Sequence, residues 1–244
     1  MRPMDPLAAQ SDFVFDPDKG GLLLVDKPLR WTSFDVVGKL RIAMRIAAGR
    51  KLKVGHGGTL DPLATGLLIL AYGPFTKKLM SITGEEKTYT GTITLGSVTP
   101  SYDLETALEP FGNWEGSSAA DIEAAFARFR GEQMQRPPNF SAKRFEGERA
   151  YWLARDTERA HLLDIPARSV HIHALTIRGI RGAEVDFEAH VSTGTYIRSL
   201  AHDIGQVLGC GAHLSALRRT RIGLHGIADA LSPADWSARI RGRA

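Results

Sequence analysis

The spacing of apolar residues near the start of the chain predicts a strand, a helix and a second strand. The apolar run over residues 22–25 follows two glycines and ends at Asp26, as expected of a buried strand. A helix is then predicted from Thr32 or Ser33 to the residue before Gly49, with a buried side made of Val36, Leu40, Ala43, Met44 and Ala47. Residues 67–72 predict another buried strand.

The strongest alternation of polar and apolar positions lies in KTYTGTITL, residues 87–95. Its threonines face one way, whereas Tyr89, Ile93 and Leu95 face the other. Residues 169–180 and 184–192 alternate as an antiparallel pair. A helix is predicted over 195–208, with a buried side made of Tyr196, Leu200, Ile204, Val207 and Leu208.

Helices are also predicted over residues 121–129 and from Ser232 onwards. Residues 107–118 are rich in proline, glycine and asparagine and predict a loop. Residues 133–144, QMQRPPNFSAKR, predict an exposed basic loop because two adjacent prolines oppose regular structure. The irregular order of strands and helices predicts an α+β domain.

Composition limits the class of protein. The chain has 244 residues, of which 43% are hydrophobic, so it can bury a sizeable core. Its single cysteine, Cys210, excludes an intramolecular disulfide and a cysteine-based zinc site, and favours a reducing compartment. No apolar stretch reaches membrane-spanning length, and the first residues do not resemble a signal peptide. We therefore expect a soluble, cytoplasmic protein.

The net charge of +4 is unevenly distributed. Residues 27–53 hold one acid, Asp35, among many basic residues: Lys27, Arg30, Lys39, Arg41, Arg45, Arg50, Lys51 and Lys53. Such a patch favours a polyanionic partner. A second basic cluster comprises Arg218, Arg219, Arg221, Arg239, Arg241 and Arg243. A solvated helix face or an ordinary tail explains either cluster equally well.

The stretch GHGGTLDPLATG, residues 55–66, places one carboxylate and one imidazole among glycines and small residues. An Asp-Pro pair commonly starts a helix. Here Gly66 would end such a helix after about one turn, so little helix remains for Asp61 to cap. Pro62 also holds Asp61 near the extended region. Asp61 is therefore a candidate catalytic carboxylate, beside the plainer interpretation as a helix cap.

Two further residues have a functional and a structural interpretation. Arg198 falls in the first turn of a predicted helix, where the helix dipole disfavours a cation. A carboxylate partner would compensate and would be held ionised in turn, but a surface arginine explains the position equally well. Tyr89 is either a core aromatic residue or a platform on which a base stacks.

Other reactive residues are discounted. His171 and His173 share one face of a strand, but no third ligand is evident, so no metal site is expected. Cys210 could be the nucleophile of an RNA methyltransferase, but no cofactor fingerprint accompanies it.

Taken in order, the motifs of the chain resemble those of the bacterial TruB-type tRNA pseudouridine synthases, which act on the T-loop uridine at tRNA position 55. The resemblance runs from about Gly20 to Gly223 and rests on LLLVDKP, GHGGTLDPLATG, KTYTGTITLG, QRPPNFSAKRFEGERAYWLAR, and STGTYIRSLAHDIG followed by GCGAHLSALRRTRIG. Residues 99–105, TPSYDLE, depart from the commoner family form TDTxDxxG.

The resemblance implies a pseudouridine synthase fold, with a mixed, mostly antiparallel central sheet flanked by helices. It implies a catalytic domain over residues 20–228 with a thumb loop at about 131–160. Residues 1–19 would form an N-terminal extension, and residues 229–244 a short C-terminal helix and basic tail. Many family members continue into a C-terminal PUA domain about where this chain ends, so a short form without that domain is expected.

The resemblance also implies roles for individual residues. Asp61 would be the nucleophile, Tyr89 would stack on the flipped uracil and accept a proton, and Arg198 would pair with Asp61. Roles outside the chemical step are implied for His56 in the space left by the base, Tyr196 and Leu217 in the substrate pocket, Lys27 beneath the site, and Lys143, Arg144 and Arg149 at phosphates.

The implied reaction breaks the bond from C1′ to N1 and joins C1′ to C5, so no cofactor and no metal is expected. It needs an ionised nucleophile, a base and an extruded nucleotide. The expected partner is the T-stem-loop of tRNA, bound by a monomer that requires no protein partner. The alternative is a non-catalytic tRNA-binding or folding factor on the same scaffold, which has no reason to hold Asp61, Tyr89 and Arg198 together.

Overall fold

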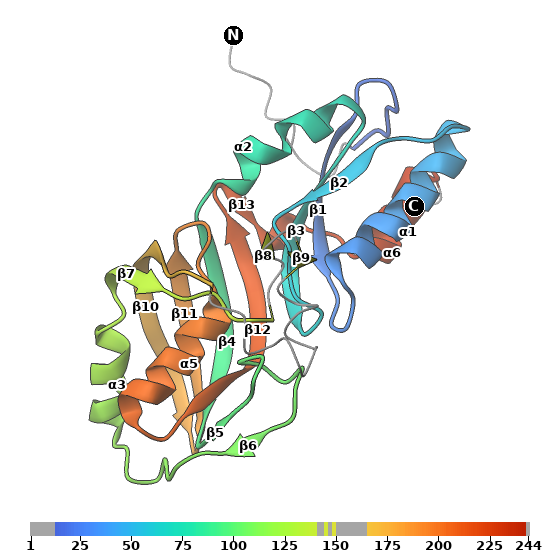
Figure 1. Ribbon diagram of the computed structural model, residues 1–244. Helices are drawn as coiled ribbons and strands as arrows, with labels where there is room; N and C mark the ends of the chain where they lie inside the picture. The colour runs from blue at the N-terminus through green and yellow to red at the C-terminus, as the bar shows by residue number, and fades with distance from the viewer. Residues whose placement is uncertain (1–12, 141–143, 146–147, 150–164, 243–244) are drawn as a thin grey trace. The chain divides into compact units, whose positions relative to one another are not determined.

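The computed structural model describes residues 13–140, 144–145, 148–149 and 165–242. It divides into two compact units whose elements are traced in Figure 1. The first unit comprises the chain up to Thr88 and from Arg218 onwards, and the second comprises Tyr89–Leu217. The boundaries fall inside two strands, β4 (Lys87–Leu95) and β12 (Ala212–Ile222).

The first unit is built on β3 (Ala64–Tyr72), which is buried along almost its whole length. The strands β1 (Gly21–Lys27) and β2 (Val54–Gly57) both pair with it in antiparallel fashion, so that Leu24 lies opposite Ile69. The end of β12 also joins β3, and it pairs in turn with β13 (His225–Gly226). The predicted strands over 22–25 and 67–72 are therefore confirmed.

Two helices of the first unit, α1 (Ser33–Ala48) and α6 (Pro233–Ile240), lie side by side (Figure 1). A capping box between Thr32 and Asp35 starts α1, and Gly49 ends it at a φ of 66°. Fully buried Trp236 of α6 donates its indole N–H to the Leu24 carbonyl at 2.7 Å. In the predicted N-terminal extension, Phe13 packs on Trp236. The unit also holds the short helices η2 (Gly73–Lys78), α2 (Leu79–Thr83) and η4 (Ile227–Asp229).

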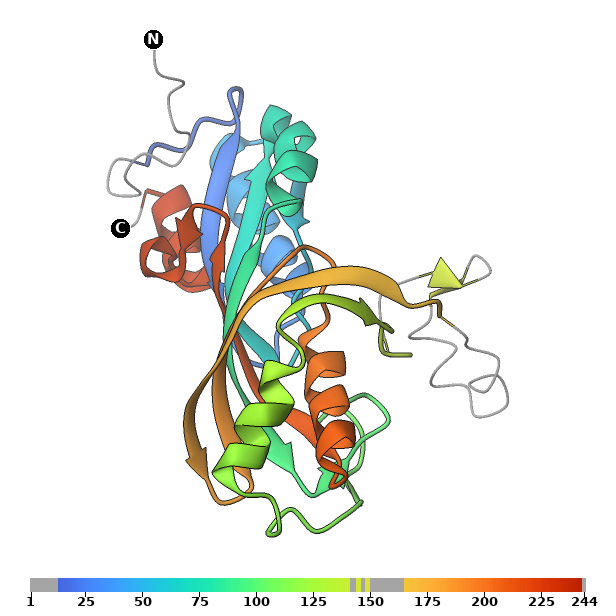
Figure 2. The same cartoon turned by 90° about the vertical axis from the view of Figure 1, so that its left-hand side faces the viewer.

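The second unit is a sheet with strand order β12, β4, β11, β10 and β7, covered on one face by two helices. Its remaining strands are β11 (Glu184–Val191), β10 (Arg168–Arg181) and β7 (Gly131–Gln135). Figure 2 shows α3 (Ala119–Ala127) beside α5 (Ile197–Leu208) on that face. Two small two-stranded sheets pair β5 (Ser97–Val98) with β6 (Glu109–Pro110), and β8 (Arg144–Phe145) with β9 (Glu148–Arg149). The predicted α+β class and mostly antiparallel pairing are confirmed.

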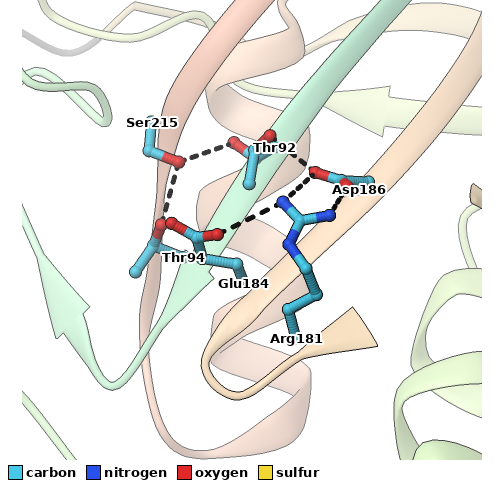
Figure 3. Close-up of polar contacts among 6 residues, drawn as sticks. All are labelled: Thr92, Thr94, Arg181, Glu184, Asp186 and Ser215. Carbon is cyan, nitrogen blue, oxygen red and sulfur yellow. Dashed lines mark hydrogen bonds and ion pairs between the residues drawn. The ribbon is translucent and has the colours of Figure 1, made fainter. Parts of the chain in front are cut away.

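The opposite face of this sheet carries a polar network, shown in Figure 3. Thr92 donates to Asp186 at 2.8 Å, and Thr94 donates to Ser215 at 2.8 Å. Asp186 also binds Arg181, whose hydrogen bond is the largest cause of the lowered pKa of that carboxyl. The threonine face of β4 thus bonds across strands, which leaves Tyr89 on the buried face with Ile93 and Leu95.

Several predicted boundaries and burials are wrong. Residues 133–135 of the predicted irregular loop belong to β7, and both adjacent prolines are buried rather than exposed. The predicted loop over 107–118 contains β6. The helix predicted over 121–129 begins and ends two residues earlier, because Ser118 forms its capping box with Asp121. Ala47 and Val207, predicted on buried helix faces, are exposed at the last turns of α1 and α5.

None of the helices within the described residues is both long and apolar enough to cross a lipid bilayer.

Candidate active site

Asp61 lies in the turn that links β2 to β3, and this turn does not begin a helix. The amide of Ala64, the first residue of β3, donates to the Asp61 carbonyl at 3.0 Å. The helix-cap interpretation of Asp61 is therefore wrong. The chain instead returns at once as a buried strand, which fixes the Asp61 backbone at the end of the sheet of the first unit.

Arg219 of β12 holds both ends of this turn. Its side chain is only 1% exposed and donates to the carbonyls of Gly58 at 3.0 Å and Leu67 at 2.8 Å, with a longer contact to Thr59 at 3.5 Å. Gly66 has a φ of 103°, and a Cβ there would lie 2.3 Å from the Arg219 carbonyl oxygen. Only glycine fits where the strand passes so close to Arg219.

The sequence places Arg219 in a surface basic cluster, which is wrong for this residue. Its neighbour Arg218 is also paired, since it donates to both carboxylate oxygens of Asp26 at 2.6 and 3.0 Å. The two arginines are adjacent in one strand, and adjacent residues of a strand face opposite ways. A strand assignment would therefore have indicated that one of the two arginines is buried. Residues 212–222 had not been predicted as a strand.

Lys27 lies at the end of β1 and is completely buried. Its ammonium donates to the carbonyls of Trp31 at 2.6 Å and Pro28 at 3.1 Å, and lies 3.5 Å from the carbonyl of Pro62. Burial lowers the pKa of Lys27 to about 8, although the attraction of the Asp61 carboxylate acts in the opposite direction. Lys27 therefore contacts the Asp61 turn through both its hydrogen bonds and its charge.

The start of α1 is tied to the same turn. The Ser33 hydroxyl accepts from the Leu60 amide at 2.9 Å and donates to the Leu60 carbonyl at 3.1 Å. Since Leu60 precedes Asp61, the first residue of α1 and the candidate nucleophile are fixed to one another through a buried contact.

His56 lies on β2, half-buried, with its ring edge-on to Phe34 at a centroid distance of 6.5 Å. Burial, and then the charge of Arg219, lower the pKa of His56. Among the described residues, its Nδ1 has no hydrogen-bond partner although the atom is buried. A neutral imidazole of this kind suits packing against a base better than binding a phosphate.

In the second unit, Arg198 occupies the first turn of α5, as predicted, but it is 5% exposed. It donates to the Ser101 carbonyl at 3.1 Å, and its Nε lies 3.7 Å from the carboxylate of buried Asp103. The surface-arginine interpretation is therefore wrong. Asp103 is a carboxylate partner that sequence reasoning missed, although it stands at the second aspartate of the TDTxDxxG pattern from which residues 99–105 depart.

The loop that carries Asp103 is tightly bonded. Thr99 and Ser101 both donate their hydroxyls to the Asp103 carbonyl, at 2.7 and 3.1 Å. Tyr102 has a φ of 63°, which is uncommon for a residue with a side chain, and its ring stacks on His202 at 4.0 Å. Strain of this kind is typical of a loop that must hold one shape.

The predicted site residues thus fall in both units. Asp61, His56 and Lys27 belong to the first unit. The second unit holds Tyr89, which is 7% exposed, with Arg198, Tyr196 and Leu217. The backbone of Tyr196 is clamped by the side-chain amide of Gln135, which donates to its carbonyl and accepts from its amide. The predicted pairing of Asp61 with Arg198 joins residues of different units and stays a prediction.

The remaining candidates are placed as follows. Arg144 and Arg149 lie in β8 and β9, and Lys143 lies outside the described residues. His171 and His173 are exposed on β10 with their rings 4.5 Å apart. Within the described ranges, no group of three histidine, cysteine, aspartate or glutamate side chains is arranged to hold a metal. Cys210 is buried.

Family models match most of the chain. The model of the TruB family pseudouridylate synthase N-terminal domain matches residues 45–197. The model of the tRNA pseudouridylate synthase B C-terminal domain matches residues 198–235. The two matches meet between Ile197 and Arg198, at the start of α5.

Two curated relatives match over nearly their whole length. The tRNA pseudouridine synthase B of Flavobacterium johnsoniae is 44% identical over 215 residues, which cover 87% of this chain and 93% of the relative. That of Chloroherpeton thalassium is 47% identical over 227 residues, with coverages of 92% and 91%. Among solved structures, the chain resembles one in the archaeal box H/ACA sRNP Nop10-Cbf5 complex, with a TM-score of 0.64 and 26% identity. The match covers 95% of this chain and 60% of that one.

Proposed function

Since this chain belongs to the TruB family of pseudouridylate synthases, we propose a target nucleotide and a role for each residue of the candidate active site. The enzyme isomerises uridine to pseudouridine in tRNA. We propose the T-loop uridine at position 55 as its target, bound by a monomer in the cytoplasm.

Asp61 is the nucleophile in this proposal. Its carboxylate attacks the target nucleotide, at the ribose C1′ or the uracil C6, and the bond between C1′ and N1 breaks. The uracil turns and C1′ joins C5, while the bond to the Asp61 carboxylate breaks and frees the enzyme. The C5 proton leaves to a base and N1 gains a proton, so atoms and electrons balance without a further reactant. The nucleotide must first leave the RNA stack, because its reacting atoms lie inside a folded loop.

The first unit supports this role through the rigidity of the Asp61 turn. Arg219 bonds to carbonyls on both sides of the turn, and Lys27 bonds beneath it. Both cations are buried, so their contacts with the turn are shielded from water. A carboxylate held in one place by buried contacts has little reorganisation left before attack.

The second unit supplies the groups that act on the base. We assign Tyr89 to stacking against the flipped uracil and accepting the C5 proton, and Tyr196 and Leu217 to the wall of the pocket. We assign Arg198, which donates to the Ser101 carbonyl and lies beside Asp103, to pairing with Asp61. The neutral ring of His56 fills the place that the base leaves. Lys143 and Arg144 contact phosphates from the thumb loop.

One observation carries the proposal: two buried cations, Arg219 and Lys27, bond to the turn that holds Asp61, the one acid of GHGGTLDPLATG. Its test is the release of tritium from tRNA labelled at C5 of uridine, because forming the new bond expels that hydrogen. The wild-type enzyme should release one label per tRNA. A transcript with cytidine at position 55 should release none, whereas release from that transcript would overturn the proposed position.

A further inference from the structure

A row of apolar residues on α1 faces solvent. Phe34 is 68% exposed, Ile42 is 50% exposed and Ile46 is 58% exposed. With Gly38 they recur every four residues and so follow one side of the helix. A Cβ built on Gly38 meets nothing within 4 Å, which shows that the row is uncovered at its middle. The opposite side of α1 packs into the core through Val36, Leu40 and Met44.

The far end of this row opens into a basic hollow of about 450 Å³. Its lining consists of two apolar residues, Ile42 and Leu52, and three cations, Arg41, Arg45 and Lys51. All three cations are exposed. In the part of the chain that the structure describes, none of the three forms an ion pair with an acid. Their positive charge is therefore available to a ligand.

The near end of the row reaches the candidate active site within the same unit. The Phe34 ring meets the ring of His56 edge-on, and the preceding residue, Ser33, is bonded to Leu60 beside Asp61. An α-helix rises about 1.5 Å per residue, so Arg41 and Arg45 lie roughly 12 and 18 Å along the axis from Ser33. About four to five stacked nucleotides of one strand cover that distance.

We propose that this α1 surface, from Phe34 to the hollow at Arg41, Arg45 and Lys51, binds the substrate tRNA at nucleotides outside the target position. Phe34 offers a ring face or edge to a base or ribose, and the three cations bind phosphates. The inference rests on the tRNA substrate of the proposed function. An apolar row flanked by unpaired cations matches the alternation of sugar, base and phosphate in RNA. A purely apolar protein partner would leave the cations buried without counter-charges.

The test is the dissociation constant for full-length tRNA, measured across a range of salt concentrations. Arg45→Glu should raise the Kd about tenfold at moderate salt and make its salt dependence shallower by about one counterion per lost phosphate contact. Arg45→Lys keeps the positive charge, so it should keep both the Kd and its salt dependence near the wild-type values. Lys19→Glu is the matched control, since Lys19 is 85% exposed in the same unit and has the same charge. It should leave the Kd near the wild-type value.

The apolar half of the surface is tested by Phe34→Ala, which should raise the Kd about five- to tenfold because a stacked base contact is lost. Leu224→Ala is the control, because Leu224 is 90% exposed in the same unit. Equal Kd values for Phe34→Ala, Arg45→Glu and the wild type would overturn the proposal. So would variants that alter self-association in sedimentation while binding tRNA normally. The readout is affinity, so it does not depend on which residue attacks the nucleotide.

Discussion

Each unit contains a buried arginine in the candidate active site, but the two arginines have different hydrogen-bond and ion-pair partners. Arg219, in the first unit, donates to backbone carbonyls around the Asp61 turn. Arg198, in the second unit, has the Ser101 carbonyl and the carboxylate of Asp103. The first arrangement leaves a positive charge next to the turn, whereas the second balances the charge of its arginine.

The difference shows in the neighbouring titratable groups. The charge of Arg219 contributes to the lowered pKa values of Lys27, His56 and Lys87, each of which is lowered chiefly by burial. The turn around Asp61 thus lies in a positively charged environment. The Asp103 loop instead provides a fixed geometry. In the proposed function, the first unit fixes the Asp61 turn, while the second carries Tyr89 and Arg198.

Replacing Arg219 with Met should have the largest effect. It removes the buried guanidinium that donates to the carbonyls of Gly58 and Leu67, so we expect a loss of about 3–5 kcal/mol in the free energy of unfolding. Chemical denaturation measures this loss. Arg221→Met, on an exposed neighbour in β12, should change the value by less than about 0.5 kcal/mol. Similar losses for both variants would mean that the buried bonds of Arg219 do not hold the turn.

Removing the ion pair of the second unit should cost somewhat less. Arg198→Met leaves the Asp103 carboxylate buried without its cation, and we expect a loss of about 3 kcal/mol. A double-mutant cycle with Asp103→Ala should give a coupling energy of about 1–3 kcal/mol, because the two side chains are within 4 Å. Additive losses would show that the pair does not stabilise the loop.

Alanine substitutions at two glycines with positive φ separate the cost of a close contact from the cost of backbone strain. Gly66→Ala places a Cβ against the Arg219 backbone and should cost at least about 2 kcal/mol. Gly194 has a φ of 88°, but a Cβ there meets nothing within 4 Å, so Gly194→Ala should cost about 1 kcal/mol from strain alone. Thermal unfolding compares the two. Equal losses would contradict the close contact at Gly66.

The smallest effect concerns pH. Burial raises the pKa of Asp203 on α5 to about 6, above the ordinary value of 3.8. The folded state therefore disfavours the charged carboxylate. The contribution of Asp203 to the free energy of unfolding falls as the pH rises from about 4 through 6. Asp203→Asn should gain about 1 kcal/mol above pH 6, after allowance for partial exposure, and nothing below pH 4. A gain at every pH would point to packing instead.

Much of this fold follows from local patterns in the sequence. The capping residues of α1 and the alternation in β4 predict those elements because they depend on neighbours in the chain. The motif order points to the family and to the Asp61 turn. The burial of Arg219 could not be predicted in this way, because its acceptors Gly58 and Leu67 lie more than 150 residues away in the chain. Asp103 was missed for the same reason, since its partner Arg198 comes from a distant helix.

The central claim is that the carboxylate of Asp61 performs the attack. Its most direct test is the single-turnover formation of pseudouridine at position 55 by Asp61→Asn, with tRNA binding measured in parallel. Asp229→Asn makes the same change at an exposed acid of the first unit. We expect Asp61→Asn to bind tRNA but react about a thousandfold more slowly or not at all, and Asp229→Asn to react like the wild type. Pseudouridine formed by Asp61→Asn at the wild-type rate would contradict the account.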